Sequence, residues 1–161
     1  MSERQIVLTP AGLQKIEEEL RQMQSVRRQE VAELIRQAKD LGDVSENSEY
    51  ETAKTEQAFL EGRIAELKSI LGAATILDMS EVATDHVGIG TVVTVREPGT
   101  KDDWELTLVG SYEADPDEDR ISNESPIGEA LTGKKVGEVV EVKAPGGKLQ
   151  YEVVAIRRQG A

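Results

Sequence analysis

The stretch that decides the fold covers residues 34–54 and reads LIRQAKDLGDVSENSEYETAK. Its first part ends an apolar pattern with helical spacing, and Gly42 then stands where a helix commonly stops. A second pattern with the same spacing begins almost at once, at Tyr50. Two long helices joined by so short a connection must lie antiparallel, so the stretch predicts the turn of a helical hairpin.

Outward from this turn, both predicted helices are long and have a heptad spacing. Thr9 and Pro10 suit the N-cap and the first position of the first helix. One additional interval of four near Arg27 relaxes the supercoil without ending the helix. The seam positions are Leu13, Ile16, Leu20, Met23, Arg27, Val31, Leu34, Ala38 and Leu41, then Tyr50, Ala53, Gln57, Leu60, Ile64, Leu67, Leu71 and Ala74. They predict an antiparallel coiled coil, here called the rod.

The second half of the chain has a different composition, because ten of the 14 glycines and four of the five prolines lie after residue 79. A short helix is predicted at 126–131, with Ser125 as its N-cap and Gly133 after its end. Pro145-Gly146-Gly147 predicts a hairpin turn between the last two strands. Alternating apolar residues predict strands at 91–95, 105–109, 138–142 and 151–156.

These patterns together predict an α+β protein of two domains. Residues 1–79 are expected to form a coiled-coil hairpin domain with an acidic tip at 42–49. Residues 80–161 are expected to form a small antiparallel sheet with one short helix.

The charge and composition of the chain limit its partners. Its 161 residues include 19 Lys and Arg, 31 Asp and Glu and no cysteine, for a net charge of −12. That balance argues against general binding to nucleic acid or to an anionic membrane. Disulfides, thiolate zinc sites and thiol nucleophiles are excluded. No apolar run approaches the roughly 20 residues that span a bilayer, and no secretory signal begins the chain, so we expect a cytoplasmic protein.

Two acidic residues at the predicted tip are candidates for chemistry. Asp43 and Glu46 lie three positions apart, so a helical segment would project both carboxylates to one side. Carboxylates and water are the ligands that Mg²⁺ prefers, but two side chains leave a site that needs oxygens from another molecule. The spacing also fits a capping arrangement in which Asp43 begins the second helix and Glu46 reaches back. Taken alone, it favours capping over metal binding.

Basic side chains on the rod are candidates for contact with RNA phosphates. Arg36, Lys39 and Lys54 lie near the tip, and Arg27 and Arg28 lie further along the rod. Most exposed charges on a coiled coil are only solvated, so that alternative weighs against each of them.

Several segments resemble the GreA/GreB family of bacterial transcript-cleavage factors. Residues 42–54 resemble the family's tip motif, and Glu61-Gly62-Arg63-Ile64 resembles part of its second helix. Residues 122–138 resemble a second signature, and Pro145-Gly146-Gly147 with the following Tyr151-Glu152-Val153 resembles the terminal hairpin. The resemblance covers nearly the whole chain, with its motifs in order.

The resemblance implies that residues 80–161 form an FKBP-like domain without isomerase activity, which docks at the rim of the secondary channel of RNA polymerase. The rod then passes down this channel to the active centre. Asp43 and Glu46 correspond to the family's tip acids, which help hold a Mg²⁺ shared with the polymerase and position a water. The polymerase thereby hydrolyses the 3′ end of backtracked RNA.

The resemblance therefore implies an accessory factor and not an enzyme, with Mg²⁺ bound stably only in the complex. Arg36, Lys39 and Lys54 become candidates for contact with the nascent RNA 3′ end. We expect a monomer with no membrane partner.

Three residues depart from the family pattern. Ser45 stands where members often have a basic residue, Glu51 adds an acid near the tip, and Thr132 replaces an apolar residue. The less basic rod favours the GreA branch of the family over the GreB branch.

Two alternatives belong to other classes of function. A Gre-like regulator could occupy the channel and inhibit the polymerase without stimulating cleavage, which the intact pair of Asp43 and Glu46 disfavours. An independent prolyl isomerase is disfavoured because only Trp104, Tyr112 and Tyr151 could supply an aromatic pocket in the second domain.

Overall fold

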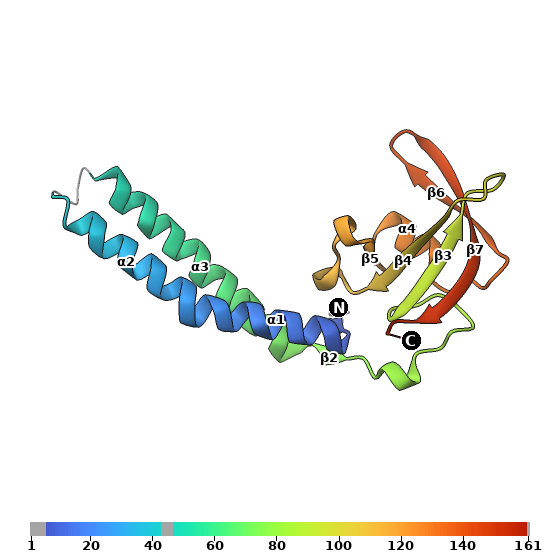
Figure 1. Ribbon diagram of the computed structural model, residues 1–161, viewed down its shortest axis with the longest axis horizontal. Coiled ribbons are helices and arrows are strands. Elements are labelled where there is room, and N and C mark those ends of the chain that lie inside the picture. Colours follow the sequence, from blue (N-terminus) through green and yellow to red (C-terminus); the bar gives the residue numbers. More distant parts are fainter. Residues whose placement is uncertain (1–5, 43–46, 161) are drawn as a thin grey trace, which may run out of the picture. The chain divides into compact units, whose positions relative to one another are not determined.

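The computed structural model describes residues 6–42 and 47–160 of the chain. By their contacts, the residues form two units (Figure 1). The hairpin unit is Leu13–Ala74, and the C-terminal unit combines Met1–Gly12 with Thr75–Ala161. Residues 1–12 and 75–79 thus group with the C-terminal unit, whereas the sequence placed them in the hairpin domain.

The hairpin unit consists of two helical arms, as the heptad pattern predicts. The first arm contains α1 (Pro10–Gln22), a π-helical turn (Met23–Arg27) and α2 (Arg28–Lys39). The second arm is α3 (Ser48–Ala73), which runs back along the first (Figure 1). Thr9 caps α1 as predicted, because its Oγ1 accepts a hydrogen bond of 3.1 Å from the Gly12 amide.

The π-helical turn lies where the sequence has its additional interval of four. A π turn takes up one extra residue within a helix, so the arm continues through it. Beyond the turn, Val31 and Ala38 are buried as predicted. The seam position predicted for Leu34 is wrong: Leu34 is 42% exposed, and Ile35 packs against the core instead.

A narrow apolar seam joins the two arms. Val31 from α2 and Leu60 and Ile64 from α3 form its buried centre. Ion pairs that cross between the arms flank this seam: Arg27 with Glu56, Arg28 with Glu61, and Arg63 with Glu19. The seam supplies the apolar burial, and the flanking pairs fix which side chains face each other.

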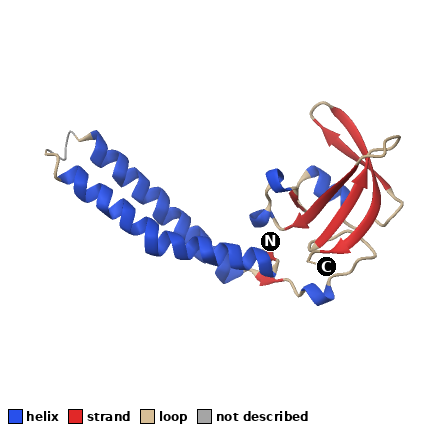
Figure 2. Ribbon diagram, viewed as in Figure 1, coloured by secondary structure: helices blue, strands red, loops and turns tan. Residues whose placement is uncertain are grey.

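The C-terminal unit is built on a curled five-stranded sheet with the order β5-β4-β3-β7-β6 (Figure 2). All four predicted strands are present and pair antiparallel. The fifth strand, β5, was not predicted and pairs parallel to β4, so the sheet is mixed and not wholly antiparallel. The bounds are β3 (Thr91–Arg96), β4 (Asp103–Val109), β5 (Arg120–Ser122), β6 (Val139–Ala144) and β7 (Gly147–Arg158).

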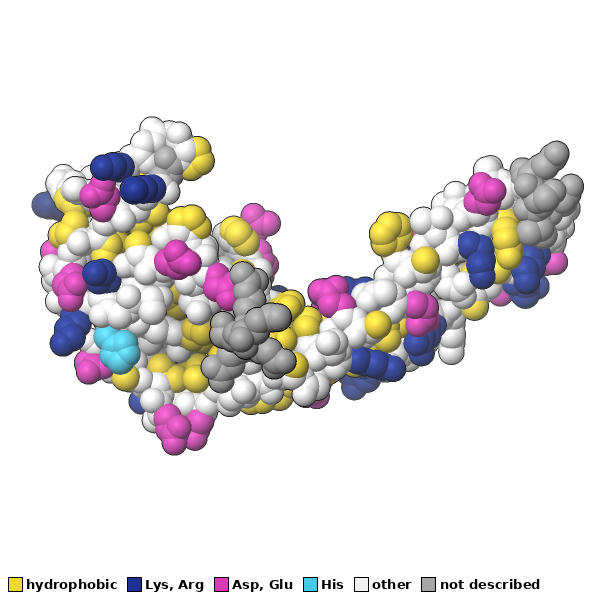
Figure 3. All heavy atoms as spheres, turned by 180° about the vertical axis from the view of Figure 1, so that it is seen from behind, with side chains coloured by type: hydrophobic (Ala, Val, Ile, Leu, Met, Phe, Trp, Pro, Cys, Tyr) yellow, Lys and Arg dark blue, Asp and Glu magenta, His cyan; other side chains and the backbone are white. Residues whose placement is uncertain are grey.

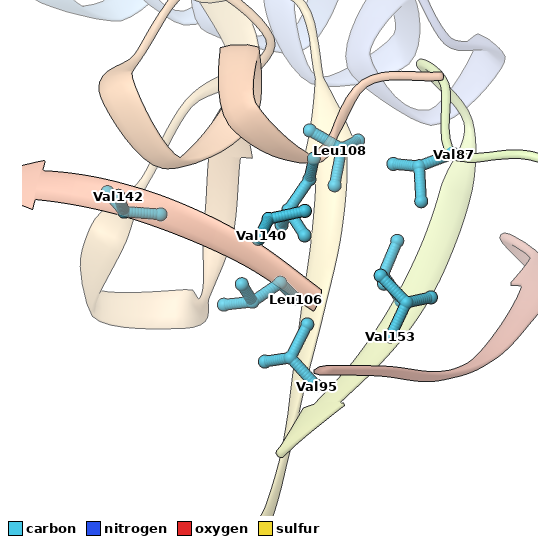
Figure 4. Close-up of a cluster of buried hydrophobic side chains, with 9 residues drawn as sticks. Val87, Val95, Leu106, Leu108, Val140, Val142 and Val153 are labelled. Atoms are coloured by element: carbon cyan, nitrogen blue, oxygen red, sulfur yellow. The ribbon is translucent and has the colours of Figure 1, made fainter. Parts of the chain in front are cut away.

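The core of this unit lies between one face of the sheet and the short helix α4 (Pro126–Leu131). Ser125 caps α4 as predicted, with its Oγ accepting from the Gly128 amide at 3.2 Å. Gly128 is required there because an added Cβ would lie 1.9 Å from the carbonyl oxygen of Ser122. Seven of the core side chains are labelled in Figure 4: Val87, Val95, Leu106, Leu108, Val140, Val142 and Val153.

Two very short strands, which the sequence did not predict, complete the C-terminal unit. β1 (Val7–Leu8) precedes α1, and β2 (Thr75–Ile76) follows α3. They pair parallel, with Val7 opposite Thr75 and Leu8 opposite Ile76. The chain therefore leaves this unit for the hairpin and returns to it at adjacent points. Among the described helices, none is long and apolar enough to cross a bilayer.

Candidate functional site

The predicted tip acids, Asp43 and Glu46, lie outside the described residues, and so does Ser45. They belong to the segment that joins α2 to α3. The structure describes both flanks of this segment, and these flanks carry the other predicted site residues.

The first flank is the end of α2. The helix ends at Lys39, and the Asp40 amide donates a last helical bond of 3.2 Å to the Arg36 carbonyl. Gly42 follows with a φ of +128°, a backbone conformation that residues with a Cβ rarely adopt. The predicted stop at Gly42 is confirmed.

The second flank is the start of α3, where Asn47 is the N-cap. Its Oδ1 accepts hydrogen bonds from the amides of Glu49 and Tyr50, at 3.0 and 3.1 Å. Its Nδ2 donates to the carbonyl of Ala38 on α2. The side chain of Asn47 thus caps the start of the second helix and bonds it to the end of the first.

Asn47 was missed in the sequence, and its role corrects the alternative that assigned the cap to Asp43. The second helix begins at Ser48, so the capping position falls on Asn47. An available signal was the pair Glu49 and Glu51 directly after it, because acidic residues favour the first turn of a helix.

The three predicted RNA-contacting residues differ in their surroundings. Arg36 is paired within α2: its guanidinium bonds the Glu33 carboxylate and lies 3.6 Å from the Asp40 carboxylate. The bond to Glu33 raises the pKa of Arg36 and lowers that of Glu33. Lys54 donates to the neutral Gln57 at 3.0 Å. Lys39 has no ion-pair partner among the described residues, so Lys39 and Lys54 offer less compensated charge than Arg36.

A small groove lies between α2 and α3 beside the tip, with a volume of about 320 Å³. Ala38 and Ala53 form part of its apolar lining, and Glu49 and Glu56 add carboxylates. Figure 3 shows basic side chains gathered toward this end of the hairpin as well. The described surface near the tip thus carries both acidic and basic side chains. These side chains project from the two helix ends that Asn47 joins.

The described residues, 6–42 and 47–160, hold no metal-binding cluster of their own. Within these ranges no group of three or more His, Asp or Glu side chains could hold a metal ion. The two carboxylates of the joining segment remain the candidate oxygen ligands, and two ligands alone leave most positions around Mg²⁺ to water or to another molecule.

The aromatic residues of the C-terminal unit do not gather in one place. The rings of Trp104 and Tyr151 form a tilted pair with centroids 6.2 Å apart. Tyr112 instead lines a separate cavity with Val7 and Ile89. Thr132, which departs from the expected apolar type, donates from Oγ1 to the Gly128 carbonyl at 2.6 Å and so closes the end of α4.

Two family models match the chain and together cover most of it. Residues 6–76 match the family described as Transcription elongation factor, N-terminal. Residues 82–158 match the family described as Transcription elongation factor, GreA/GreB, C-term.

Individual relatives extend over almost the whole chain. Transcription elongation factor GreA of Clostridium perfringens is 49% identical over 158 residues, which cover 98% of this chain and 100% of that protein. The protein of the same name from Alkaliphilus oremlandii is 51% identical over 158 residues, covering 98% and 99%. The crystal structure of GreA factor homolog 1 (Gfh1) of Thermus thermophilus is 33% identical, with a TM-score of 0.42 and coverage of 96% and 99%.

Proposed function

The chain belongs to the GreA/GreB family of transcription elongation factors, and from that premise we propose how it acts. The rod enters the secondary channel of RNA polymerase, and the factor stimulates the polymerase's own Mg²⁺-dependent hydrolysis of backtracked RNA 3′ ends. The observation that carries this proposal is a two-armed helical hairpin, capped on both flanks of a segment that contains Asp43 and Glu46.

The length of the rod supports this reach. α3 has 26 residues, which at about 1.5 Å per residue extend roughly 39 Å. A packed antiparallel pair is stiffer than a single helix, because the apolar seam and the crossing ion pairs join the arms. Such a rod can carry a few side chains into a channel that admits no globular domain.

The chemistry of the tip supports the proposed role in hydrolysis. Carboxylate oxygens from Asp43 and Glu46 are suitable Mg²⁺ ligands, but they need others to complete the site. Bound between factor and polymerase, the ion would stabilise charge on the oxygens of the scissile phosphate. The chain's own contribution is to hold two carboxylates and to orient a water by hydrogen bonding. Alone, the factor hydrolyses nothing.

The flanks of the tip support contact with RNA. Lys39 and Lys54 carry charge that no described carboxylate neutralises, whereas Arg36 is already bonded to Glu33. A phosphate could therefore be bound by either lysine without breaking an ion pair that the described residues form. We assign the main phosphate contacts to Lys39 and Lys54 and a secondary one to Arg36.

The second candidate function is occupation of the channel without stimulation of cleavage. The same capped rod would serve it, since plugging a channel requires length and stiffness but no carboxylates. The two functions differ in what removal of the tip carboxylates does, so one experiment separates them.

The test uses a stalled, backtracked elongation complex with Mg²⁺ and labelled RNA. The parent protein is expected to speed release of short 3′ fragments, and Asp43→Asn and Glu46→Gln variants are expected to lose this effect while still binding polymerase. Glu17→Gln, an exposed acid in α1, is the charge-matched control and should act like the parent. Binding with slowed elongation and no cleavage would support the second function, and cleavage by both tip variants at the parent's rate would overturn the first.

A further inference from the structure

A buried carboxylate lies at the start of the first helical arm. The side chain of Glu113, at the end of the 3₁₀ turn Ser111–Glu113, is only 2% exposed. Its Oε2 accepts from the Thr9 amide at 2.8 Å, and its Oε1 accepts from the Thr9 hydroxyl at 2.6 Å. Oε1 also accepts from Arg120 at 3.0 Å. Both oxygens are therefore satisfied, as a buried charge requires.

These bonds form a capping box whose acid comes from a distant part of the chain. In the usual arrangement the third residue of the helix is Glu or Gln and bonds the amide of the N-cap residue. Here that third residue is Gly12, and Glu113, 104 residues from Thr9 in sequence, bonds the amide instead. The Thr9 hydroxyl still accepts from the Gly12 amide at 3.1 Å, so both halves of the box are present.

Gly12 makes room for this carboxylate. A Cβ added at Gly12 would lie 2.1 Å from both Cδ and Oε1 of Glu113. The Glu113 side chain cannot easily yield, because it is buried and held by three hydrogen bonds. Any larger residue at position 12 would therefore displace the carboxylate from the helix start.

The capping box lies at the start of a helix that the two units share. Thr9, Gly12 and Glu113 all belong to the C-terminal unit, and α1 runs on from Gly12 into the hairpin unit without a break. The first turn of α1 is thus clamped within the unit proposed to dock, while the rest of the helix belongs to the rod proposed to reach the active centre.

We infer that Glu113 is a positioning residue: by clamping the first turn of α1, it lets a docked C-terminal unit direct the rod and so places the tip carboxylates. This inference rests on the proposed function. Small misplacement of reacting groups can cost orders of magnitude in rate, so loosening the clamp should lower cleavage at saturation more than it weakens binding.

The first readout measures the free protein and needs no polymerase. The chain has no cysteine, so Gln29→Cys on α2 and Glu129→Cys on α4 allow specific spin labelling at two exposed helical sites. We expect a wider distribution of label distances when the clamp is removed by Glu113→Gln. Thr9→Val removes the hydroxyl but keeps the amide bond, so it should give a smaller broadening. Thr9→Ser should restore the parent's distribution.

The second readout separates binding from cleavage in backtracked complexes. For Glu113→Gln we expect the cleavage rate at saturation to fall about 10-fold, with the half-maximal concentration changed by less than about twofold. Glu118→Gln, an exposed acid in the same unit, is the matched control and should behave like the parent.

The outcomes separate this inference from the proposed function. An unchanged distance distribution in Glu113→Gln, or a loss confined to half-maximal concentration, overturns the positioning role. If thermal unfolding shows that Glu113→Gln does not fold, Thr9→Val decides the question by the same readouts. If the parent itself does not stimulate cleavage, the proposed function fails, and the width of the distance distribution alone decides whether Glu113 clamps the helix.

Discussion

The guanidinium of Arg28 on α2 donates two hydrogen bonds, both 2.8 Å long, to the carboxylate of Glu61 on α3. This bidentate pair joins the two arms of the rod and has the planar geometry that favours charge-assisted bonding. It lowers the pKa of Glu61 below its usual value of about 4.5 and raises the pKa of Arg28.

The first prediction concerns the effect of pH on this pair. Because folding lowers the pKa of Glu61, the pair stabilises the rod fully above about pH 4.5 and loses its effect as the pH falls through the lowered pKa. Glu61→Gln should lower the melting temperature slightly at neutral pH, since both groups are exposed to solvent. The difference from the parent should shrink in acid, as measured by circular dichroism.

Glu17→Gln removes an exposed acid on α1 that has no ion-pair partner among the described residues, so it serves as the control. Its melting temperature should follow the parent's at each pH. A Glu61→Gln difference that stays constant from neutral pH to strong acid would contradict the assigned role of the pair.

The second prediction compares two glycines of the hairpin unit. Gly42 has a φ of +128°, while Gly62 lies inside α3, and an added Cβ at either one would meet no atom of the described residues within 4 Å. Gly42→Ala should therefore destabilise the rod by about 1 kcal/mol through backbone strain alone. Gly62→Ala should stabilise it by about 0.5–1 kcal/mol. Urea unfolding, followed by helix content, measures the change in the free energy of unfolding for both variants. Changes of the same sign would contradict the difference in backbone conformation between Gly42 and Gly62.

The third prediction concerns Asn47, which caps α3 and donates to Ala38. Asn47→Ala removes both functions and should cost about 1 kcal/mol or more. Asn47→Asp keeps the acceptor for the cap but loses the donor to the Ala38 carbonyl, so its effect should be intermediate. Amide hydrogen exchange at Glu49 and Tyr50 reports the cap directly. Faster exchange in the Ala variant alone is expected, and equal protection in all three proteins would exclude the capping role.

The fourth prediction concerns the core of the C-terminal unit. Leu108 on β4 is fully buried, so Leu108→Ala should cost about 2–5 kcal/mol through lost burial and a residual cavity. Leu149 on β7 is 41% exposed and undergoes the same chemical change in Leu149→Ala, which should cost much less. Denaturant unfolding followed by Trp104 fluorescence compares them, and similar losses would show that the two sites differ less in packing than their exposure indicates.

The sequence predicted the elements that repeat a pattern over many residues. Both arms of the rod, four strands and α4 were found in this way, because each has a regular apolar period or clear capping residues. The strands β1, β2 and β5 were missed because two or three residues are too few to show a period. Leu34 was placed in the seam because the interval from Val31 to Ala38 was divided into steps of three and four, whereas in the structure the step of four comes first and Ile35 packs against the core.

The site was less predictable than the fold for a different reason. Several residues around the turn could cap a helix, and only the observed start of α3 at Ser48 selects Asn47 over Asp43. Glu113 gives no local signal at all, since its partner Thr9 is 104 residues away in the sequence. Contacts of that kind depend on the completed tertiary structure.

The pairing of β1 with β2 joins the chain segment that leads into the rod to the segment that follows it. Val7 lies opposite Thr75 and Leu8 opposite Ile76, so backbone hydrogen bonds join the chain segments on either side of residues 13–74. No residue of the rod takes part in these bonds. We therefore expect that arms of another length, or a turn with other side chains, can be introduced by mutation or grafting while the remainder of the protein keeps its own sheet and core.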